Sequence, residues 1–370
     1  MNRAPALLMV ILLVFSFGLD ASSKKWLSLW PSLAALIAIF ATKKTLPGLL
    51  LGSVIGACML SSSFLHFFEV LFVDHLFLLT TNRWNIAVII FTLLLGAFAE
   101  LLERGGGFNA LINRVVKRAD KAPRSMQWFA FGLGLICFFD GLANSMLVGK
   151  TLAGSAEKHG VPREKMAYIV DSTSSSVACV ALISTWIAYQ LAMIQEGFAL
   201  AHIEMEVSAF SLFIHSIPYN FYCWFTLILL VLTLLTQWRV GPMRSAKTRA
   251  SNKLESVEIS LPFEPLFRTV LVPILVLILS LFTGLYVSGS EQLQWPTSVK
   301  QLSTAVGAAN AARVLVLASL ISVLTAWWMN HKPIRQQQEH ALQVIGSGMK
   351  KISGPIFILL SAWLLSGILK

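Results

Sequence analysis

Two aspartates stand alone in long apolar stretches of this 370-residue chain. Asp140 is the single charged residue between Phe129 and Gly149, and Asp171 is the single one between Met166 and Ile194. A carboxylate inside a membrane is costly unless it is paired, hydrated or protonated. Burial favours the protonated form, whereas a bound cation favours the ionised form. Each aspartate therefore has the chemistry to hold either a proton or a sodium ion, and to exchange one for the other.

Small neutral polar residues follow both aspartates. Asn144 comes soon after Asp140, and a run of five hydroxyl residues, 172–176, comes directly after Asp171. Hydroxyl and freed carbonyl oxygens coordinate sodium where transporter helices are broken. The alternatives are that the hydroxyls bond back to the preceding helical turn and that Asp171 caps a helix. We expect a broken helix here, with ion-binding residues Asp140, Asn144, Asp171, Ser172, Thr173, Ser184 and Thr185; the two aspartates are the expected sodium ligands.

The composition shows what kind of chain must position these residues. Hydrophobic residues make up 56% of the sequence and charged residues 13%, and the mean hydropathy is +0.72. These values exclude a water-soluble domain, a disordered chain and a nucleic-acid-binding protein. A membrane span needs about 20 mostly apolar residues. We expect an all-α polytopic membrane protein with about nine such spans, over 4–20, 26–42, 45–63, 84–102, 166–194, 209–236, 266–287, 312–329 and 352–369.

Three regions are harder to assign from composition. Residues 64–80 mix Glu69 and Asp74 with phenylalanines and leucines, which favours an interfacial helix. Residues 1–22 read as a short first span or as a cleaved signal sequence. Gly48, Gly52 and Gly56 share one helix face and predict close approach of a neighbouring helix.

The net charge of +11 records the orientation of the chain in the membrane. Basic residues cluster in 104–124, 239–253 and 332–351, which should therefore face the cytoplasm, as should the N-terminus. The acidic loop 196–206 should face outward. Three apolar segments lie between the first two basic loops. Three full crossings would put these loops on opposite sides of the membrane, so one segment must enter the membrane and leave on the side it entered from. We expect that segment 126–149 is a re-entrant hairpin with its turn near Asp140–Asn144.

Several linked motifs resemble the NhaC-type Na+/H+ antiporter family. The resemblance covers about residues 26–370 in order, and it is specific for the family but not for the substrate. The matching segments are Gly105–Phe108, Phe138–Asn144, Arg163–Thr173, Ala181–Trp186, Ile217–Tyr219, Phe221–Tyr222, Gly241–Met243 and Ala362–Trp363.

The resemblance implies an architecture of two inverted repeats, each with a re-entrant hairpin and a broken helix. It predicts one integral membrane transporter domain over 1–370, with a first repeat at about 26–236, a cytoplasmic loop at 239–262 and a partial second repeat at about 262–370. Family members carry a second acid after the first, where this chain has Gly141. The second hairpin and broken helix are not found before Lys370, so we expect an incomplete inverted-repeat transporter.

The predicted function is secondary active exchange of sodium for protons by alternating access, in a multi-pass protein of the bacterial inner membrane. The expected partners are the lipid bilayer and the transported Na+ and H+, with no cofactor and no nucleic acid; a homodimer is left open. One alternative is a sodium-coupled transporter of a small organic anion, although no Lys or Arg lies in the apolar core of the site. Another is an inactive fragment. We do not expect an enzyme, because neither aspartate has the Gly-x-Gly-Asp context of an intramembrane aspartyl protease.

Overall fold

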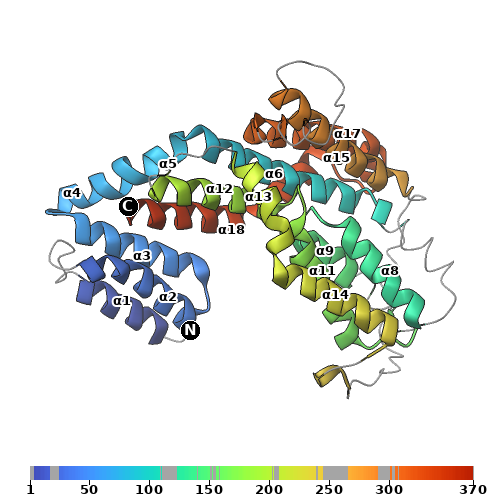
Figure 1. Ribbon diagram of the computed structural model, residues 1–370, viewed down its shortest axis with the longest axis horizontal. Helices are drawn as coiled ribbons and strands as arrows, with labels where there is room; N and C mark the ends of the chain where they lie inside the picture. The colour runs from blue at the N-terminus through green and yellow to red at the C-terminus, as the bar shows by residue number, and fades with distance from the viewer. Residues whose placement is uncertain are drawn as a thin grey trace. The chain divides into compact units, whose positions relative to one another are not determined.

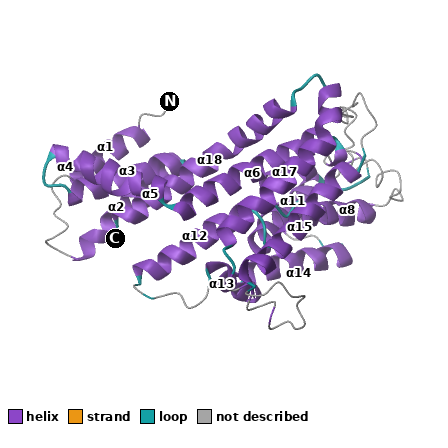
Figure 2. Ribbon diagram, turned by 90° about the horizontal axis from the view of Figure 1, so that it is seen from above, coloured by secondary structure: helices purple, strands orange, loops and turns teal. Residues whose placement is uncertain are grey.

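All regular elements of the described residues are helices, as Figure 2 shows. The computed structural model describes residues 4–16, 25–108, 110, 123–139, 141–150, 152, 156–157, 159–201, 203, 208–238, 241–244, 266–290, 301, 305–306 and 308–369. The predicted all-α fold class is confirmed. The chain divides into two compact units, one of residues 1–89 and 352–370 and the other of residues 90–351.

The first unit is built on three short apolar helices that pack against one another (Figure 1). A Cβ at Gly52 would lie 2.8 Å from the Ala35 Cβ, and one at Gly56 would lie 2.5 Å from the side chain of Ile368. The predicted close approach along the glycine face is therefore confirmed. The elements of this unit are α1 (Ala4–Ser16), η1 (Lys25–Leu29), α2 (Trp30–Thr42), α3 (Thr45–Leu60), α4 (Phe64–Phe68), η2 (Glu69–Phe77) and α5 (Leu78–Thr81).

The segment expected to lie in the membrane interface forms α4, the π-helix η2 and α5. Val70 and Leu71 are buried against Leu364 and Ile368 of the same unit. The rings of Phe64, Phe68 and Phe72 instead remain exposed along one side. This division into a buried side and an aromatic side is consistent with an interfacial helix, which stays a prediction.

The second unit holds the residues that the sequence singled out. Helix α6 (Arg83–Arg104) belongs to this unit from Ile90 onward, and α18 (Ala341–Ile368) belongs to it up to Lys351. Helix α11 packs on α8, α9 and α14, and α15 packs on α17. The other elements are α8 (Pro123–Ile136), α9 (Gly141–Asn144), the π-helix η3 (Ser145–Lys150), α11 (Arg163–Val180), α12 (Thr185–Leu200), α13 (Ala209–Ser216), η4 (Ile217–Tyr219), α14 (Phe221–Thr236), η5 (Gly241–Arg244), α15 (Arg268–Gly289) and α17 (Ala311–Gln336).

Four helices of the described part of the chain are long and apolar enough to cross a membrane: α6, α15, α17 and α18. The bent pair formed by 209–219 and 221–236 makes a fifth if it counts as one span. Shorter apolar helices occupy 6–16, 27–42 and 45–60. Helices thus stand at each of the predicted positions, and the count of about nine spans stays a prediction.

Two of the predicted spans are not continuous helices. The span over 166–194 is interrupted at 181–184, between α11 and α12. The expectation that the helix breaks at the hydroxyl run is wrong, because Ser172–Ser176 lie inside α11. The span over 209–236 bends by 46° at Asn220, where the side chains of Tyr219 and Tyr222 are exposed.

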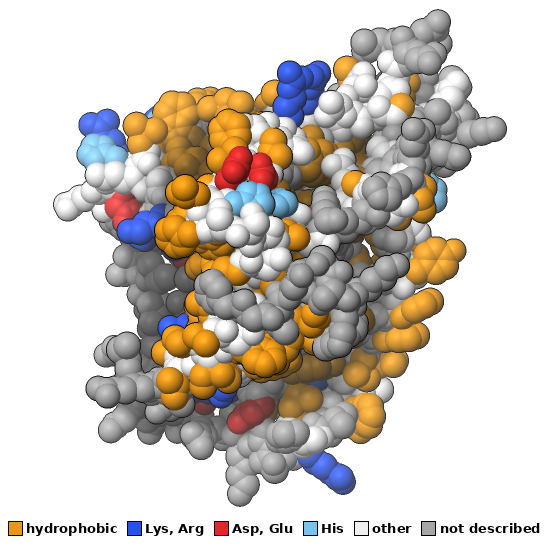
Figure 3. All heavy atoms as spheres, turned by 90° about the vertical axis from the view of Figure 1, so that its left-hand side faces the viewer, with side chains coloured by type: hydrophobic (Ala, Val, Ile, Leu, Met, Phe, Trp, Pro, Cys, Tyr) orange, Lys and Arg blue, Asp and Glu red, His pale blue; other side chains and the backbone are white. Residues whose placement is uncertain are grey.

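Large apolar side chains form the exposed surface of several helices. On α14 these include Phe225, Ile228 and Leu229, and on α15 they include Leu275 and Leu279. Figure 3 shows one face of the molecule, on which hydrophobic side chains are the most frequent of the described ones and charged side chains are scattered among them. Such a surface is stable in lipid and unstable in water, so the chain is a membrane protein.

Candidate functional site

The chain folds back on itself after α8 and meets α11 there. Helix α8 ends at Ile136, a turn occupies 137–139, and α9 begins at Gly141. The turn starts slightly before the predicted one at Asp140–Asn144. The Asn144 Nδ2 donates to the carbonyl oxygen of Gly134 at 3.3 Å and to the Thr173 Oγ1 at 3.3 Å. Asn144 therefore ties the two arms of the fold-back to each other and to α11; we call this contact the Asn144 junction.

Glycines make the Asn144 junction possible. A Cβ at Gly134 would lie 2.7 Å from the Thr173 Cβ, so only glycine lets α8 approach α11 this closely. A Cβ at Gly141 would lie 2.9 Å from the carbonyl oxygen of Ser174. The position where related antiporters were expected to carry a second acid is therefore filled by backbone of α11.

A buried oxygen at the junction lacks a hydrogen-bond partner among the described residues. The Asn144 side chain is 1% exposed, and its Oδ1 accepts no hydrogen bond from any described group. A buried acceptor without a donor is destabilising unless an ion, a water or another group occupies it. Asn144 Oδ1 is thus suited to bind a cation, and Asp140, which precedes Gly141, lies outside the described residues.

Most of the hydroxyl run is hydrogen-bonded within its own helix. The Thr173 Oγ1 donates to backbone carbonyl oxygens at Ile169 and Val170, 2.9 and 3.1 Å away. Ser174 and Ser175 both donate to the carbonyl oxygen of Asp171 at 3.1 Å. Ser172 is buried in the same helix. The alternative that these hydroxyls bond back to the preceding turn is therefore confirmed for three of them.

Asp171 does not join the junction. It lies in the middle of α11 with an exposed side chain, whereas Thr173, two residues on, is fully buried. Successive residues of a helix are separated by about 100°, which places these two on opposite faces. Neither does Asp171 cap a helix, which was the alternative considered above.

The exposed face around Asp171 differs from the exposed faces of α14 and α15. Ala167 and Asp171 are exposed and Ser175 is half-buried along one line of α11, so this face carries only small or polar side chains. A charged side chain in an apolar helix faces protein or water rather than lipid.

The interruption between α11 and α12 is closed by Ser184. Its Oγ accepts from the Ile187 N–H at 3.2 Å and donates to the carbonyl oxygen of Ala178 at 2.6 Å. Ser184 is thus the N-cap of α12 and also ties that helix to the end of α11. Thr185 is the first residue of α12, and its side chain lies outside the described part of the structure.

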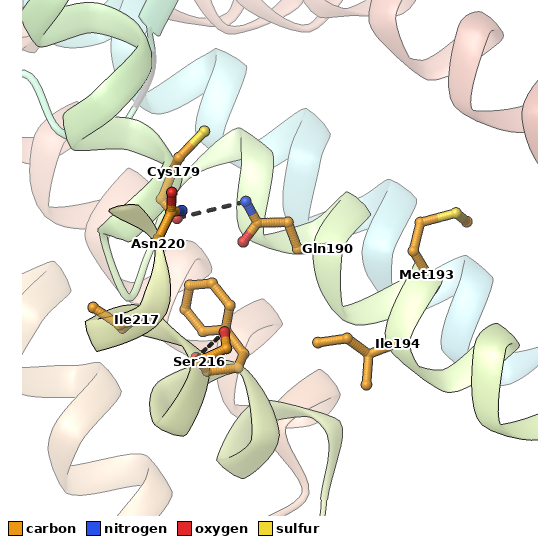
Figure 4. A pocket seen from close by; sticks show the side chains of 8 residues that line it. Cys179, Gln190, Met193, Ile194, Ser216, Ile217 and Asn220 are labelled. Carbon is orange, nitrogen blue, oxygen red and sulfur yellow. Dashed lines mark hydrogen bonds between the residues drawn. The ribbon is translucent and has the colours of Figure 1, made fainter. Parts of the chain in front are cut away.

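A cavity of about 280 Å³ lies between α12, the end of α11 and the bend at Asn220 (Figure 4). Gln190 reaches across from α12 and donates to the carbonyl oxygen of Cys179 at 3.5 Å. Asn220 accepts from the Cys223 N–H at 3.4 Å and caps α14. No charged side chain is among the described residues that line the cavity, which are Cys179, Gln190, Met193, Ile194, Phe213, Ser216, Ile217 and Asn220.

Asn144, Asp171, Ser172, Thr173 and Ser184, the predicted site residues whose side chains the structure describes, do not line this cavity. Gln190 and Asn220 were not predicted, because a single amide in an apolar segment carries no sequence signal of its own. The sequence Ile217-Pro218-Tyr219-Asn220 did offer one, since proline followed by a capping residue is typical of a helix interruption.

Comparison with known proteins gives matches over most of the chain. The Na+/H+ antiporter family matches residues 177–370, which is more than half of the sequence. An uncharacterized protein of Haemophilus influenzae is 27% identical over 363 residues, which cover 95% of this chain and 68% of that protein. No solved structure matches the chain.

Proposed function

Because the chain belongs to the Na+/H+ antiporter family, we propose that it exchanges sodium ions for protons across a membrane. The observation that supports this most directly is the buried Asn144 Oδ1, an oxygen without a described partner, four residues after Asp140 in the sequence. An oxygen ligand and a carboxylate together suit a small monovalent cation.

In the proposed cycle, Asp140 carries either a proton or a sodium ion. When sodium is bound, Asp140 is ionised and Asn144 Oδ1 supplies a second oxygen. When a proton replaces the ion, the carboxyl becomes neutral and needs no cation. The proton and the sodium ion compete for one carboxylate. Movement of one ion down its gradient in one direction therefore drives movement of the other ion in the opposite direction.

The helices around the cavity are interrupted, which suits the change of shape that alternating access requires. Two interrupted helices, α11–α12 and α13–α14, flank the neutral cavity. Interrupted helices change direction at their breaks at low cost, since Ser184 and Asn220 already satisfy the backbone groups there. We propose that the cavity is an aqueous entrance, that the exposed face of α11 with Asp171 lines the same route, and that the protein resides in a bacterial inner membrane with its N-terminus in the cytoplasm.

The test uses everted membrane vesicles from a bacterial host that lacks its own sodium/proton antiporters. Respiration acidifies the vesicle interior, and added sodium should then dissipate the pH gradient, as followed by a pH-sensitive dye. Asp140→Asn should abolish this response. Asp171→Asn, the same chemical change on the exposed face of α11, should retain exchange with a raised KM for sodium.

Controls separate loss of the protein from loss of transport and from transport of another substrate. Immunoblots establish that each variant reaches the membrane at the wild-type level. If wild type gives no sodium response but takes up radiolabelled organic acids in a sodium-dependent way, the function is organic anion transport. If it does neither, the proposal of exchange by this chain alone is wrong.

A further inference from the structure

A buried carboxylate outside the Asn144 junction is held by two basic side chains. Glu100 lies on α6, and its side chain is 2% exposed. Its Oε1 accepts from the Arg104 Nε at 3.2 Å, and its Oε2 is bound by the Lys351 Nζ of α18. The sequence does not single out Glu100, because burial by a distant helix leaves no local pattern.

The ion pairs continue around the C-terminal end of α6. The Lys351 Nζ also lies 3.7 Å from Glu103 Oε2, and the Arg104 Nη1 lies 2.7 Å from Glu339 Oε1. The Gln337 Nε2 donates to the Arg104 carbonyl oxygen at 2.6 Å. This end of α6 is thus bound by α18 and by the connection between α17 and α18.

The backbones of these helices also pack closely at the same place. A Cβ at Gly348 of α18 would lie 2.8 Å from the Glu100 Cβ and 2.9 Å from the Ala97 Cα. A Cβ at Gly107 would lie 2.5 Å from Thr269 Oγ1, and Gly105 lies directly against the Asn330 side chain. Glycines therefore bring the end of α6 into contact with α15, α17 and α18.

We propose that the Glu100–Lys351 pair fixes α6 to α18 in a joint that stays closed throughout the transport cycle, so that Glu100 and Lys351 are positioning residues. The alternative is a gate that opens. Opening would separate closely packed backbones and leave the buried Glu100 carboxylate with Arg104 as its one remaining cation among the described residues, which is strongly unfavourable. The geometry therefore favours a fixed joint about which other helices move. This inference rests on the proposed function insofar as it concerns a transport cycle.

The native side chains allow a direct test. A water-soluble carbodiimide activates a carboxylate, the Lys351 amine displaces the resulting urea, and an amide bond forms with net loss of one water from the protein. Mass spectrometry of digested protein identifies the Lys351 link to Glu100 or Glu103. Lys351→Arg is the matched control, because a guanidinium keeps the ion pair but forms no such amide.

Two outcomes support the joint. The yield of the Lys351 link should be the same, within twofold, with or without sodium and at either end of the working pH range. Carbodiimide also modifies other carboxylates, and the loss of sodium response in treated Lys351→Arg measures that effect. The linked wild type should keep the same fraction of its sodium response as treated Lys351→Arg does.

Other outcomes overturn it. A link that forms in only one ionic condition indicates a gate, as does wild-type exchange that stops while treated Lys351→Arg continues. Absence of the link indicates that the pair is not formed. The yield measurement does not require transport, so failure of sodium exchange and failure of the joint are separate results.

A charge exchange provides a second test if single variants fold poorly. Glu100→Lys and Lys351→Glu, each combined with Arg104→Gln, should lower membrane abundance severalfold, because the first buries a lysine beside Lys351 and the second sets an acid against the buried Glu100. The variant that carries both charge reversals together with Arg104→Gln should recover abundance and sodium exchange. If neither membrane abundance nor sodium exchange recovers, the pair does not position these helices.

Discussion

Gly141 lies against the carbonyl oxygen of Ser174 so closely that a Cβ would be 2.9 Å from that oxygen. The resemblance to NhaC-type antiporters leads us to expect an acid at this position, and the structure shows why this chain does not accept one without rearrangement. A carboxylate there would be forced toward a backbone oxygen that repels it.

We therefore expect Gly141→Asp to lower stability and not to add a second ion-binding group. Overpacking of this kind costs about 1–3 kcal/mol, and Gly141→Ala should share most of that cost. Thermal unfolding of detergent-solubilised protein measures it. Gly132→Ala is the control, since a Cβ at Gly132 meets nothing within 4 Å; equal unfolding temperatures for Gly132→Ala and Gly141→Ala would contradict the contact.

The hydrogen bond from Asn144 to Thr173 should matter for both stability and sodium affinity. Thr173→Val keeps the shape of the side chain and removes the hydroxyl, which should cost about 1 kcal/mol. The freed Asn144 amide should also lose its orientation, so we expect a raised KM for sodium in the vesicle assay. Thr173→Ser retains the hydroxyl and should behave like wild type; a normal KM for Thr173→Val would exclude a role for the junction in binding.

The cap at Ser184 should determine whether α12 begins at the right residue. Ser184→Ala removes the acceptor for the Ile187 N–H and should lower the free energy of unfolding by about 1 kcal/mol. Ser184→Thr retains both the acceptor for the cap and the hydroxyl that donates to Ala178, so it should recover much of that loss. The measurement is thermal unfolding, and an unchanged midpoint for Ser184→Ala would show that the break does not depend on this cap.

The exposed face of α11 should be wet and the exposed face of α14 should not. Single cysteines at Asp171 and Ser175 are compared with single cysteines at Ile228 and Leu229, which are 53% and 44% exposed on α14. The background lacks native Cys58, Cys137, Cys179 and Cys223. Because the thiolate is the reactive form, a charged methanethiosulfonate should react about tenfold faster on α11. Equal rates on both helices would refute the proposed aqueous route.

The sequence predicted the positions of helices well because an apolar run of sufficient length is a local property. It did not predict where helices break. The hydroxyl run at 172–176 suggested a break by composition, yet Ser174 and Ser175 bond to the Asp171 carbonyl oxygen and the helix continues. The actual interruption depends on Ser184, which bonds to Ala178 as well as to its own helix.

The candidate site was predictable in part. Asn144 and Thr173 were identified from their residue types and are brought together in the structure. Gly134 was not identified, since its role depends on the approach of α11. Asp171 matches Asp140 in sequence context but lies on an exposed face, because the face of a residue follows from its helical register rather than from its neighbours in sequence.

The bend at Asn220 has an electrical consequence. Helix α14 has 16 residues, which at about 1.5 Å per residue cover about 24 Å, most of a hydrocarbon core about 30 Å thick. Tyr219 and Tyr222 are exposed beside the bend, and tyrosines of this kind mark the level of the lipid headgroups. We therefore expect the cavity to lie near one membrane surface, the outer one in the predicted orientation. An ion that enters it has crossed little of the membrane voltage, so most of the voltage dependence of transport should arise in steps beyond the cavity.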